Sequence, residues 1–340
     1  THHGYVKRLP VDTYKSQKRG GRGILGLQTK EEDFVKTMFV SSTHAHIMFF
    51  TNKGKMYRIK AYEIPEAGRQ AKGTPIVNII ALDPEESITA VIPVREYEDN
   101  RSLIMCTRAG VIKKTDLKEY ENAPKAGKIA IRLDDGDELI GVIMTSGDSD
   151  IFVGSAEGKV IRFSEEDVRN MGRVSRGVRA MKLSDTDYII GMCAEKDGGA
   201  LLTVSEKGYG KKTDLSEYKR QGRGGKGMLT YRISEETGNV SGMGIVTPDD
   251  DLILITSEGV VIRIDTEEIS TYGRVTKGVR LVRLADGVKV ISGASVQKDD
   301  SDSDQDTDAS ADGNADSDNS EISENPENSE NSEVSESTEE

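Results

Sequence analysis

The chain has 340 residues, and 46 Lys and Arg against 59 Asp and Glu give it a net charge of −13. Its two cysteines, Cys106 and Cys193, lack CxxC spacing. This argues against a disulfide framework and a thiolate metal site, and it fits a reducing cytoplasm. No apolar run approaches the roughly 20 residues of a membrane-spanning helix, so no membrane partner is expected.

The acidic excess is concentrated at the C-terminal end. Residues 299–340 hold 9 Asp and 8 Glu without Lys or Arg, which leaves 42 acidic and 46 basic residues in 1–298. The acidic segment has almost no apolar side chains, so ordering it would cost more entropy than burial returns. We predict a mildly basic folded domain at 1–298 and a disordered acidic tail at 299–340. Because the first residue is Thr1, we expect the chain to be part of a longer protein.

A short pattern recurs six times: Ser or Thr, two residues, Gly, three residues, then Lys or Arg. Its turn glycines, which define copies 1 to 6, are Gly4, Gly54, Gly110, Gly158, Gly208 and Gly259. Their spacing of 48 to 56 residues is typical of a ring or array of small repeated units.

Each copy has the pattern of a small β-sheet. An apolar run precedes the turn glycine and a β-branched run follows it, as in 252–255 and 260–264, which indicates a hairpin. Further strand-like runs, such as 76–80 and 88–94, give about four strands per copy. The sequence thus predicts an all-β, propeller-like ring of six four-stranded blades. Nothing apolar precedes Gly4, so we expect the first strand of blade one to be missing.

Two cationic positions repeat with the blades. The hairpin cation stands four residues after the turn glycine, at Arg8, Arg58, Lys114, Arg162, Lys212 and Arg263. The basic loop reads Arg-x-x-(Lys or Arg)-Gly in five copies and ends 19 residues after the turn glycine. Its cations are Arg19 and Arg22, Arg69 and Lys72, Arg173 and Arg176, Arg223 and Lys226, and Arg274 and Lys277; copy 3 keeps only Lys125 and Lys128 around Gly127.

These cations suit the phosphates of duplex DNA. A cation repeated once per unit forms a charged track, and glycine lets loop N–H groups approach an anion. Such a track releases counterions from the duplex and binds it without reading sequence. The absence of Trp argues against single-strand stacking. The alternative is a solvated rim that balances surface carboxylates, but the constant register of the hairpin cations favours DNA.

The heptapeptide Gln17, Lys18, Arg19, Gly20, Gly21, Arg22 and Gly23 resembles the gyrase-A box, and its flanks resemble the C-terminal domain of DNA gyrase A. The resemblance covers residues 1 to about 298. It implies a six-bladed β-pinwheel in which neighbouring blades exchange a strand and DNA runs around the outer rim. The box would fix the handedness of wrapping, so that the holoenzyme introduces negative supercoils.

The same resemblance implies partners and a location. The chain would act with the N-terminal part of gyrase A and with gyrase B in a heterotetramer of the bacterial cytoplasm. ATP and Mg²⁺ would be used elsewhere in that holoenzyme, and no cofactor is expected in this chain. We find no catalytic or metal-binding constellation here, so we expect no enzyme activity of its own.

Several alternatives remain. The loop Gln221–Gly227 resembles the box but has Gly222 at a basic position, so it is a degenerate or second partial box. The C-terminal domain of topoisomerase IV shares the repeat but usually lacks an intact box. A protein-interaction propeller would have apolar rim loops, and an enzyme on a propeller would need convergent carboxylates or histidines. Two GxGxxG matches, at Gly21 and Gly222, lack the following helix of a dinucleotide site.

Overall fold

A computed structural model describes residues 1, 3–10, 37–68, 71–124 and 126–298. The box Gln17–Gly23, together with Arg69, Lys125 and the acidic segment 299–340, lies outside the described residues. The predictions made for them, which include the disordered tail, therefore stay predictions.

The turn glycines of copies 2 to 6 each lie at the tip of an antiparallel hairpin, as predicted. All six turn glycines have φ between +73° and +81°, in the left-handed region. The hairpins pair β2 (His46–Thr51) with β3 (Lys55–Lys60), β6 (Ser102–Thr107) with β7 (Val111–Asp116), β10 (Asp150–Ser155) with β11 (Lys159–Ser164), β14 (Ala200–Ser205) with β15 (Tyr209–Asp214), and β18 (Asp250–Thr256) with β19 (Val261–Asp265).

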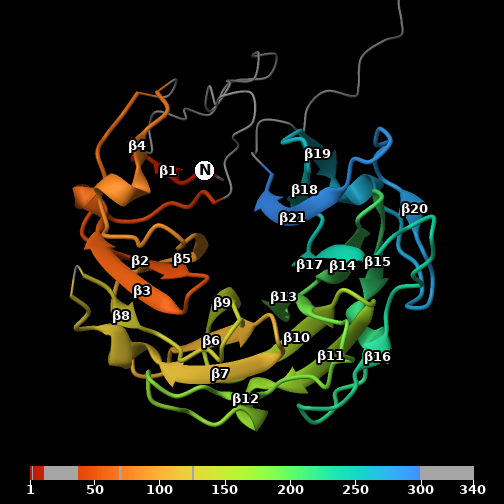
Figure 1. Cartoon of the computed structure of the whole chain (residues 1–340), viewed down its shortest axis with the longest axis horizontal. Helices are drawn as coiled ribbons and strands as arrows, with labels where there is room; N and C mark the ends of the chain where they lie inside the picture. Colours follow the sequence, from red (N-terminus) through yellow and green to blue (C-terminus); the bar gives the residue numbers. More distant parts are fainter. Residues whose placement is uncertain (2, 11–36, 69–70, 125, 299–340) are drawn as a thin grey trace, which may run out of the picture. The chain divides into compact units, whose positions relative to one another are not determined.

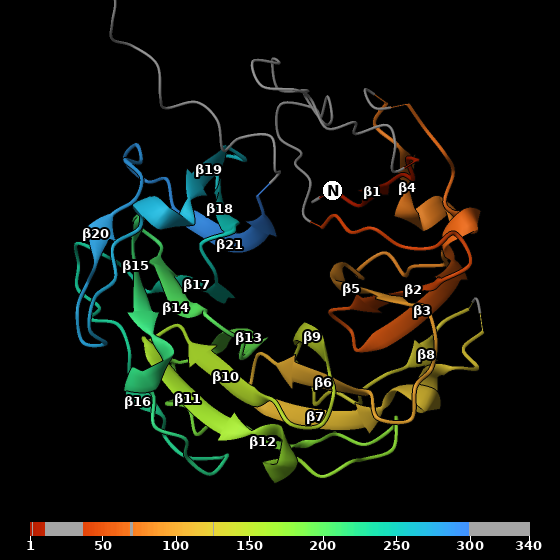
Figure 2. The same cartoon turned by 180° about the vertical axis from the view of Figure 1, so that it is seen from behind.

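A longer strand from the same copy pairs with the first strand of each hairpin. These strands are β5 (Ile88–Val94), β9 (Leu139–Thr145), β13 (Ile189–Ala194), β17 (Val240–Val246) and β21 (Val290–Gln297). The sheets follow one another around a ring, with these strands toward its inside (Figures 1 and 2).

A two-residue strand directly after each basic loop pairs with the preceding copy. These strands are β4 (Thr74–Pro75), β8 (Lys128–Ile129), β12 (Val178–Arg179), β16 (Met228–Leu229) and β20 (Val279–Arg280). β4 pairs with β1 (Tyr5–Val6), and the other four pair with β3, β7, β11 and β15. Neighbouring copies therefore exchange a strand, and the exchange carries each basic loop to the outer edge of its neighbour.

The expectation of six four-stranded blades is wrong for the described residues. Four sheets have four strands, the sheet of β18, β19 and β21 has three, and β1 and β4 form a two-stranded sheet. There are thus five sheets of blade size. The exchanged strand completes each four-stranded sheet, and among the described residues no such strand pairs with β19.

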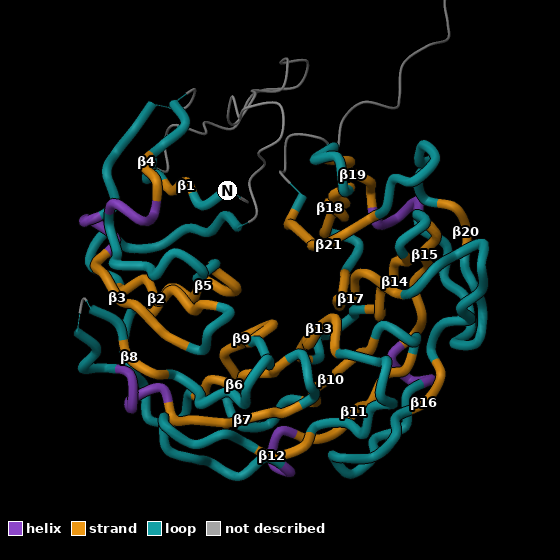
Figure 3. The backbone as a smooth tube through the Cα atoms, viewed as in Figure 1, coloured by secondary structure: helices purple, strands orange, loops and turns teal. Residues whose placement is uncertain are grey.

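A 3₁₀ turn follows the second strand of each complete hairpin: η2 (Ala61–Glu63), η4 (Leu117–Tyr120), η5 (Glu165–Asp167), η6 (Leu215–Glu217) and η7 (Thr266–Glu268). A further turn, η3 (Ile76–Asn78), follows β4. The side chains of Asp116, Ser164, Asp214 and Asp265 accept a hydrogen bond from the N–H two residues on and so begin four of these turns. Figure 3 shows the turns near the outside of the ring, and the described residues form no α-helix.

The core lies between neighbouring sheets. On β6, Leu103 and Met105 pack in one apolar cluster, whereas Ile104 and Cys106 pack in the next. Side chains of a strand alternate between its two faces, so a strand that is covered on both faces is apolar at every position. This explains the continuous apolar runs before the turn glycines.

Candidate nucleic-acid interface

The hairpin cations of copies 1 to 5 connect each copy to the next one. Arg8 Nε donates to the Ile64 carbonyl at 3.3 Å, and Arg58 donates to the Glu121 carbonyl. The Nζ of Lys114 lies 2.8 Å from Glu165 Oε1, and the Nζ of Lys212 donates to the Thr266 carbonyl at 2.7 Å. Every acceptor lies in, or next to, the 3₁₀ turn of the following copy. The constant register of the hairpin cation therefore has a structural cause within the protein.

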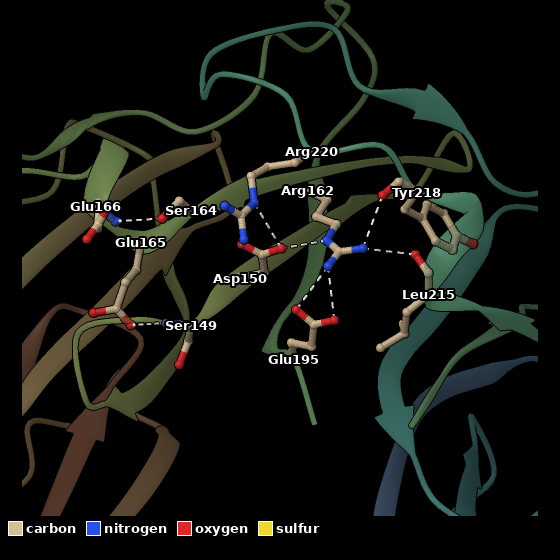
Figure 4. A network of polar contacts seen from close by, with 10 residues as sticks. All are labelled: Ser149, Asp150, Arg162, Ser164, Glu165, Glu166, Glu195, Leu215, Tyr218 and Arg220. Carbon is tan, nitrogen blue, oxygen red and sulfur yellow. Dashed lines mark hydrogen bonds and ion pairs between the residues drawn. The ribbon is translucent and has the colours of Figure 1, made fainter. Parts of the chain in front are cut away.

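Arg162 shows the most extensive of these contacts (Figure 4). Its Nε donates to Asp150 at 2.7 Å, and its Nη2 contacts both oxygens of Glu195 at 2.9 and 3.0 Å. Its Nη1 donates to the carbonyls of Leu215 and Tyr218 at 3.0 and 3.2 Å, in copy 5. Arg220, just before the basic loop of copy 5, also pairs with Asp150, at 2.7 Å.

This network is mostly buried. The side chain of Arg162 is 17% exposed and that of Asp150 is 0% exposed. A buried carboxylate needs charge-assisted partners, and the two arginines supply them from two copies. In copy 6, the last of the six, Arg263 pairs with Asp251 of its own sheet at 2.5 Å. DNA contact by the hairpin cations stays a prediction, and five of them are already held by the next copy.

The first cation of the basic loop also contacts the neighbouring copy. Arg173 donates to the Ile129 carbonyl at 3.4 Å, Arg223 to the Arg179 carbonyl at 3.2 Å, and Arg274 to the Leu229 carbonyl at 3.4 Å. Each acceptor is the second residue of the short exchanged strand of the preceding copy. These three arginines are half-buried and fix the loops to one another around the outer edge.

The second cation of the basic loop is exposed in every described loop that has it. These residues are Lys72, Arg176, Lys226 and Lys277. Arg176 pairs with Asp134 at 2.7 Å, and Lys277 pairs with Glu236 at 2.6 Å, both at the surface. The hydrogen bond from Lys277 lowers the pKa of Glu236 and raises the pKa of Lys277. Exposed pairs of this kind are weak, so a stronger anion can displace the carboxylate.

A third repeated cation was missed from the sequence. It stands five residues after the glycine of the loop, at Arg132, Lys182, Arg232 and Arg283. All four side chains are exposed, and among the described residues none of them forms an ion pair. The backbone N–H groups of Arg132, Lys182 and Arg232 donate to the basic loop of the next copy, at the carbonyls of Ser175, Gly225 and Thr276. Aligning the copies on the loop glycine instead of the turn glycine would have revealed this position.

The loop glycines serve close packing. A Cβ on Gly177 would lie 2.6 Å from the Ile112 carbonyl oxygen, and a Cβ on Gly227 would lie 2.8 Å from that of Val160. Both carbonyls belong to the hairpin of the preceding copy. The approach of these glycines to a neighbouring strand, and not to an anion, accounts for their presence in the repeat.

Other chemistry finds little support in the described residues. They contain no group of three His, Cys, Asp or Glu side chains that could hold a metal ion. Burial raises the pKa of Cys106 and of Cys193 to about 12, so neither is a thiolate near neutral pH. No helix in the described part is long and apolar enough to cross a bilayer.

Comparisons with known proteins agree with the repeat and the fold. The DNA gyrase C-terminal domain family, a beta-propeller, matches residues 1–42, 45–95, 101–146, 149–192, 200–247 and 250–297. The DNA gyrase A protein of Clostridium acetobutylicum is 48% identical over 88% of this chain, and that of Staphylococcus epidermidis is 44% identical over 88%. The chain spans only 36% and 34% of these two relatives.

Solved structures agree as well. A C-terminal domain of DNA topoisomerase IV has a TM-score of 0.77 and 26% identity, covering 87% of this chain and 91% of that one. A DNA gyrase A C-terminal domain has a TM-score of 0.67 and 27% identity, covering 86% and 96%. The six matched repeats and the gyrase A relatives confirm the resemblance seen in the sequence: the chain belongs to the DNA gyrase C-terminal domain family.

Proposed function

We propose that this chain binds and bends duplex DNA, without reading its sequence, along the outer edge formed by its basic loops. The observation that carries the proposal is the repeated pair of exposed cations. The second loop cation of one copy and the third repeated cation of the preceding copy recur at the same edge, as at Arg176 and Arg132. DNA bound there contacts several copies in turn.

The physical requirements support several contacts acting together. Smooth bending of a 20–30 bp site by 40–90° costs on the order of 1–6 kcal/mol. A single exposed cation cannot offset this, whereas one cationic pair per copy, repeated along the ring, can. Electrostatic contacts to phosphate carry no sequence information, which suits a protein that acts on any DNA segment.

In the longer protein, this domain would present a bent DNA segment to a cleavage core. We propose that it works with the N-terminal part of gyrase A and with gyrase B in the bacterial cytoplasm, where ATP and Mg²⁺ are used by those other parts. The box Gln17–Gly23 would set the handedness of the wrap, so that the holoenzyme supercoils DNA negatively. The chain itself would be the DNA-wrapping part of an ATP-dependent type II topoisomerase.

The salt dependence of DNA binding tests this proposal. The 340-residue chain is titrated with duplexes of unrelated sequence between 50 and 200 mM salt. We expect equal affinities for all sequences and a loss of about 10³–10⁵ over this range, as for a protein that contacts 6–10 phosphates. A shallow salt response, or a strong preference for one sequence, would contradict it.

A second candidate function has one observation in its favour. Some rim positions are apolar and exposed: Ile129 is 50%, Val174 is 62%, Leu229 is 42% and Val275 is 46% exposed. An apolar rim can bind a protein partner. Changing Val174 and Val275 to Ser separates the two functions, because DNA binding driven by phosphates should be unaffected.

A further inference from the structure

The copies alternate in the residue that stands three positions after the turn glycine. Copies 1, 3 and 5 have a lysine there, at Lys7, Lys113 and Lys211. Copies 2, 4 and 6 have Tyr57, Ile161 and Ile262. This position precedes the hairpin cation by one residue, so its side chain points to the opposite face of the strand.

Each of the three lysines reaches the basic loop of the following copy. Lys113 Nζ donates to the carbonyl of Arg173, the first cation of the loop, and to the Ala130 carbonyl at 2.6 Å. Lys211 Nζ donates to the carbonyls of Gly273 and Arg274 at 2.5 Å each. The third, Lys7, donates to the carbonyls of Gly68 and Ala71, at 3.2 and 3.0 Å, within the loop of copy 2.

Two of these lysines are fully buried. The exposed fraction of Lys113 and of Lys211 is 0%, and among the described residues neither forms an ion pair with a carboxylate. The pKa of Lys113 is lowered to about 7 and that of Lys211 to about 8, mainly by burial; Arg173 and Arg274 contribute in the same direction, while Glu119 and Glu217 oppose the shifts. A buried ammonium without a counter-ion is unfavourable unless its protons are hydrogen-bonded. Here the loop carbonyls are the partners.

The loop sequences follow the same alternation. Loops that lie on a lysine read Gly-Arg-x-x-(Lys or Arg)-Gly without a glycine at either x position, as in 68–73, 172–177 and 273–278. The loop that lies on Ile161 reads Gly222-Arg223-Gly224-Gly225-Lys226-Gly227. An ideal Cβ on Gly225 would lie 3.5 Å from Ile161 Cδ1, so this loop packs on an apolar side chain. The chain therefore has two kinds of basic loop with two kinds of support.

We propose that Lys7, Lys113 and Lys211 are positioning residues, which fix the basic loop of the following copy by binding its main-chain carbonyls. With the carbonyls held inward, the second cation of the loop is directed to solvent, as Arg176 and Lys277 are. The inference that this geometry promotes DNA binding rests on the proposed function, whereas the fixing of the loop does not.

The test replaces the buried amino group by a side chain of similar length that cannot donate a hydrogen bond. The variants are K113M and K211M, alone and combined, in the 340-residue chain. The matched control is I161M, which changes the equivalent position of copy 4 and keeps an apolar support. Hydrogen exchange of the loop amides is measured for segments 173–177 and 274–278, together with the affinity for duplex DNA at low salt.

We expect the lysine variants to exchange about tenfold faster in the loop that has lost its support, because the hydrogen bonds from the buried amino group to the loop carbonyls are removed. Loop 223–227 should be unchanged in K113M and K211M. The DNA affinity of the double variant should fall several-fold, and I161M should match the wild type in both measurements. Unchanged exchange in the target loops would overturn the proposal.

Two further outcomes keep the test decisive. If K113M and K211M unfold, K7M is used instead, because Lys7 is only partly buried. Faster hydrogen exchange confined to segment 68–73 in K7M supports the proposal, and unchanged exchange there overturns it. If the wild type itself does not bind DNA, the proposed function fails, yet the exchange measurement still decides whether the lysines position the loops.

Discussion

Replacing Arg162 by methionine separates the structural role of a hairpin cation from a role in DNA binding. R162M keeps much of the apolar stem but removes the guanidinium. Asp150 then loses its 2.7 Å partner, Glu195 loses two contacts, and the carbonyls of Leu215 and Tyr218 lose their donor. The contacts to Asp150 and Glu195 lie within copy 4, and the contacts to Leu215 and Tyr218 form the junction between copies 4 and 5.

The expected cost follows from the burial of the pair. Removing one partner of a buried ion pair costs about 3–5 kcal/mol. Asp150 retains Arg220, whose side chain is 61% exposed, so we expect the lower end of this range, about 3 kcal/mol. The matched control is R263M. Arg263 is 43% exposed and pairs within its own sheet with Asp251, which is 8% exposed, so its loss should cost less than the loss of Arg162.

The assay is guanidinium unfolding followed by circular dichroism, combined with hydrogen exchange at the junction. Repeat proteins unfold in parts, so local exchange shows where stability is lost. R162M should unfold at lower denaturant than R263M, and its exchange should rise at η6 (Leu215–Glu217). Its salt slope, the slope of the logarithm of the DNA-binding constant against the logarithm of the salt concentration, should equal that of the wild type. If R162M is as stable as the wild type but loses about one unit of salt slope, Arg162 binds phosphate and the assignment to the blade junction is wrong.

Three other predictions follow from the described residues. Changing Arg176, Lys226 and Lys277 to Gln should lower the salt slope of duplex binding by about one per cation without changing thermal stability; an unchanged slope would exclude these residues from the interface. Gly177→Ala should destabilise the chain by about 1–3 kcal/mol in denaturant unfolding, because Gly177 has a φ of +106° and the new Cβ would meet a backbone carbonyl. The control Gly172→Ala should leave the stability unchanged, because its new Cβ would meet no atom within 4 Å. Folded Lys113 has a pKa of about 7, so between pH 7 and 10 the unfolded residue binds a proton that the folded one does not. The free energy of unfolding should therefore rise with pH over this range, and it should rise less in K113M. If the free energy of unfolding of K113M and of the wild type depends on pH equally, the lowered pKa of Lys113 is contradicted.

The sequence predicts the hairpins and the ring well, because their signals are local. Each turn needs a residue with positive φ, and a glycine at a constant spacing reveals it, as at Gly54 and Gly158. The apolar runs identify strands that are covered on both faces. The expected number of complete blades was wrong because strand exchange is not local: β15 is paired at its outer edge by β20 of the next copy, whereas β19 has no such partner among the described strands.

The candidate site was predicted less completely. The register of Arg162 indicates a repeated function, but the sequence cannot show that its partners are Asp150, at the start of β10, and Glu195, directly after β13. The cations at Lys182 and Arg232 stand 24 residues after their turn glycines, well beyond the hairpin, so the local hairpin pattern does not point to them. The alternating lysines are visible in the sequence, but only the structure shows what their ammonium groups bind.

The topology of closed circular DNA tests the central claim most directly. Nicked circles are ligated with the 340-residue chain bound at low salt, the protein is removed, and the linking number is measured. We predict trapped superhelical turns that increase with protein concentration and disappear at high salt, where the phosphate contacts are screened. Circles with an unchanged linking number, under conditions in which the chain is bound, would contradict the wrapping of DNA along the basic loops.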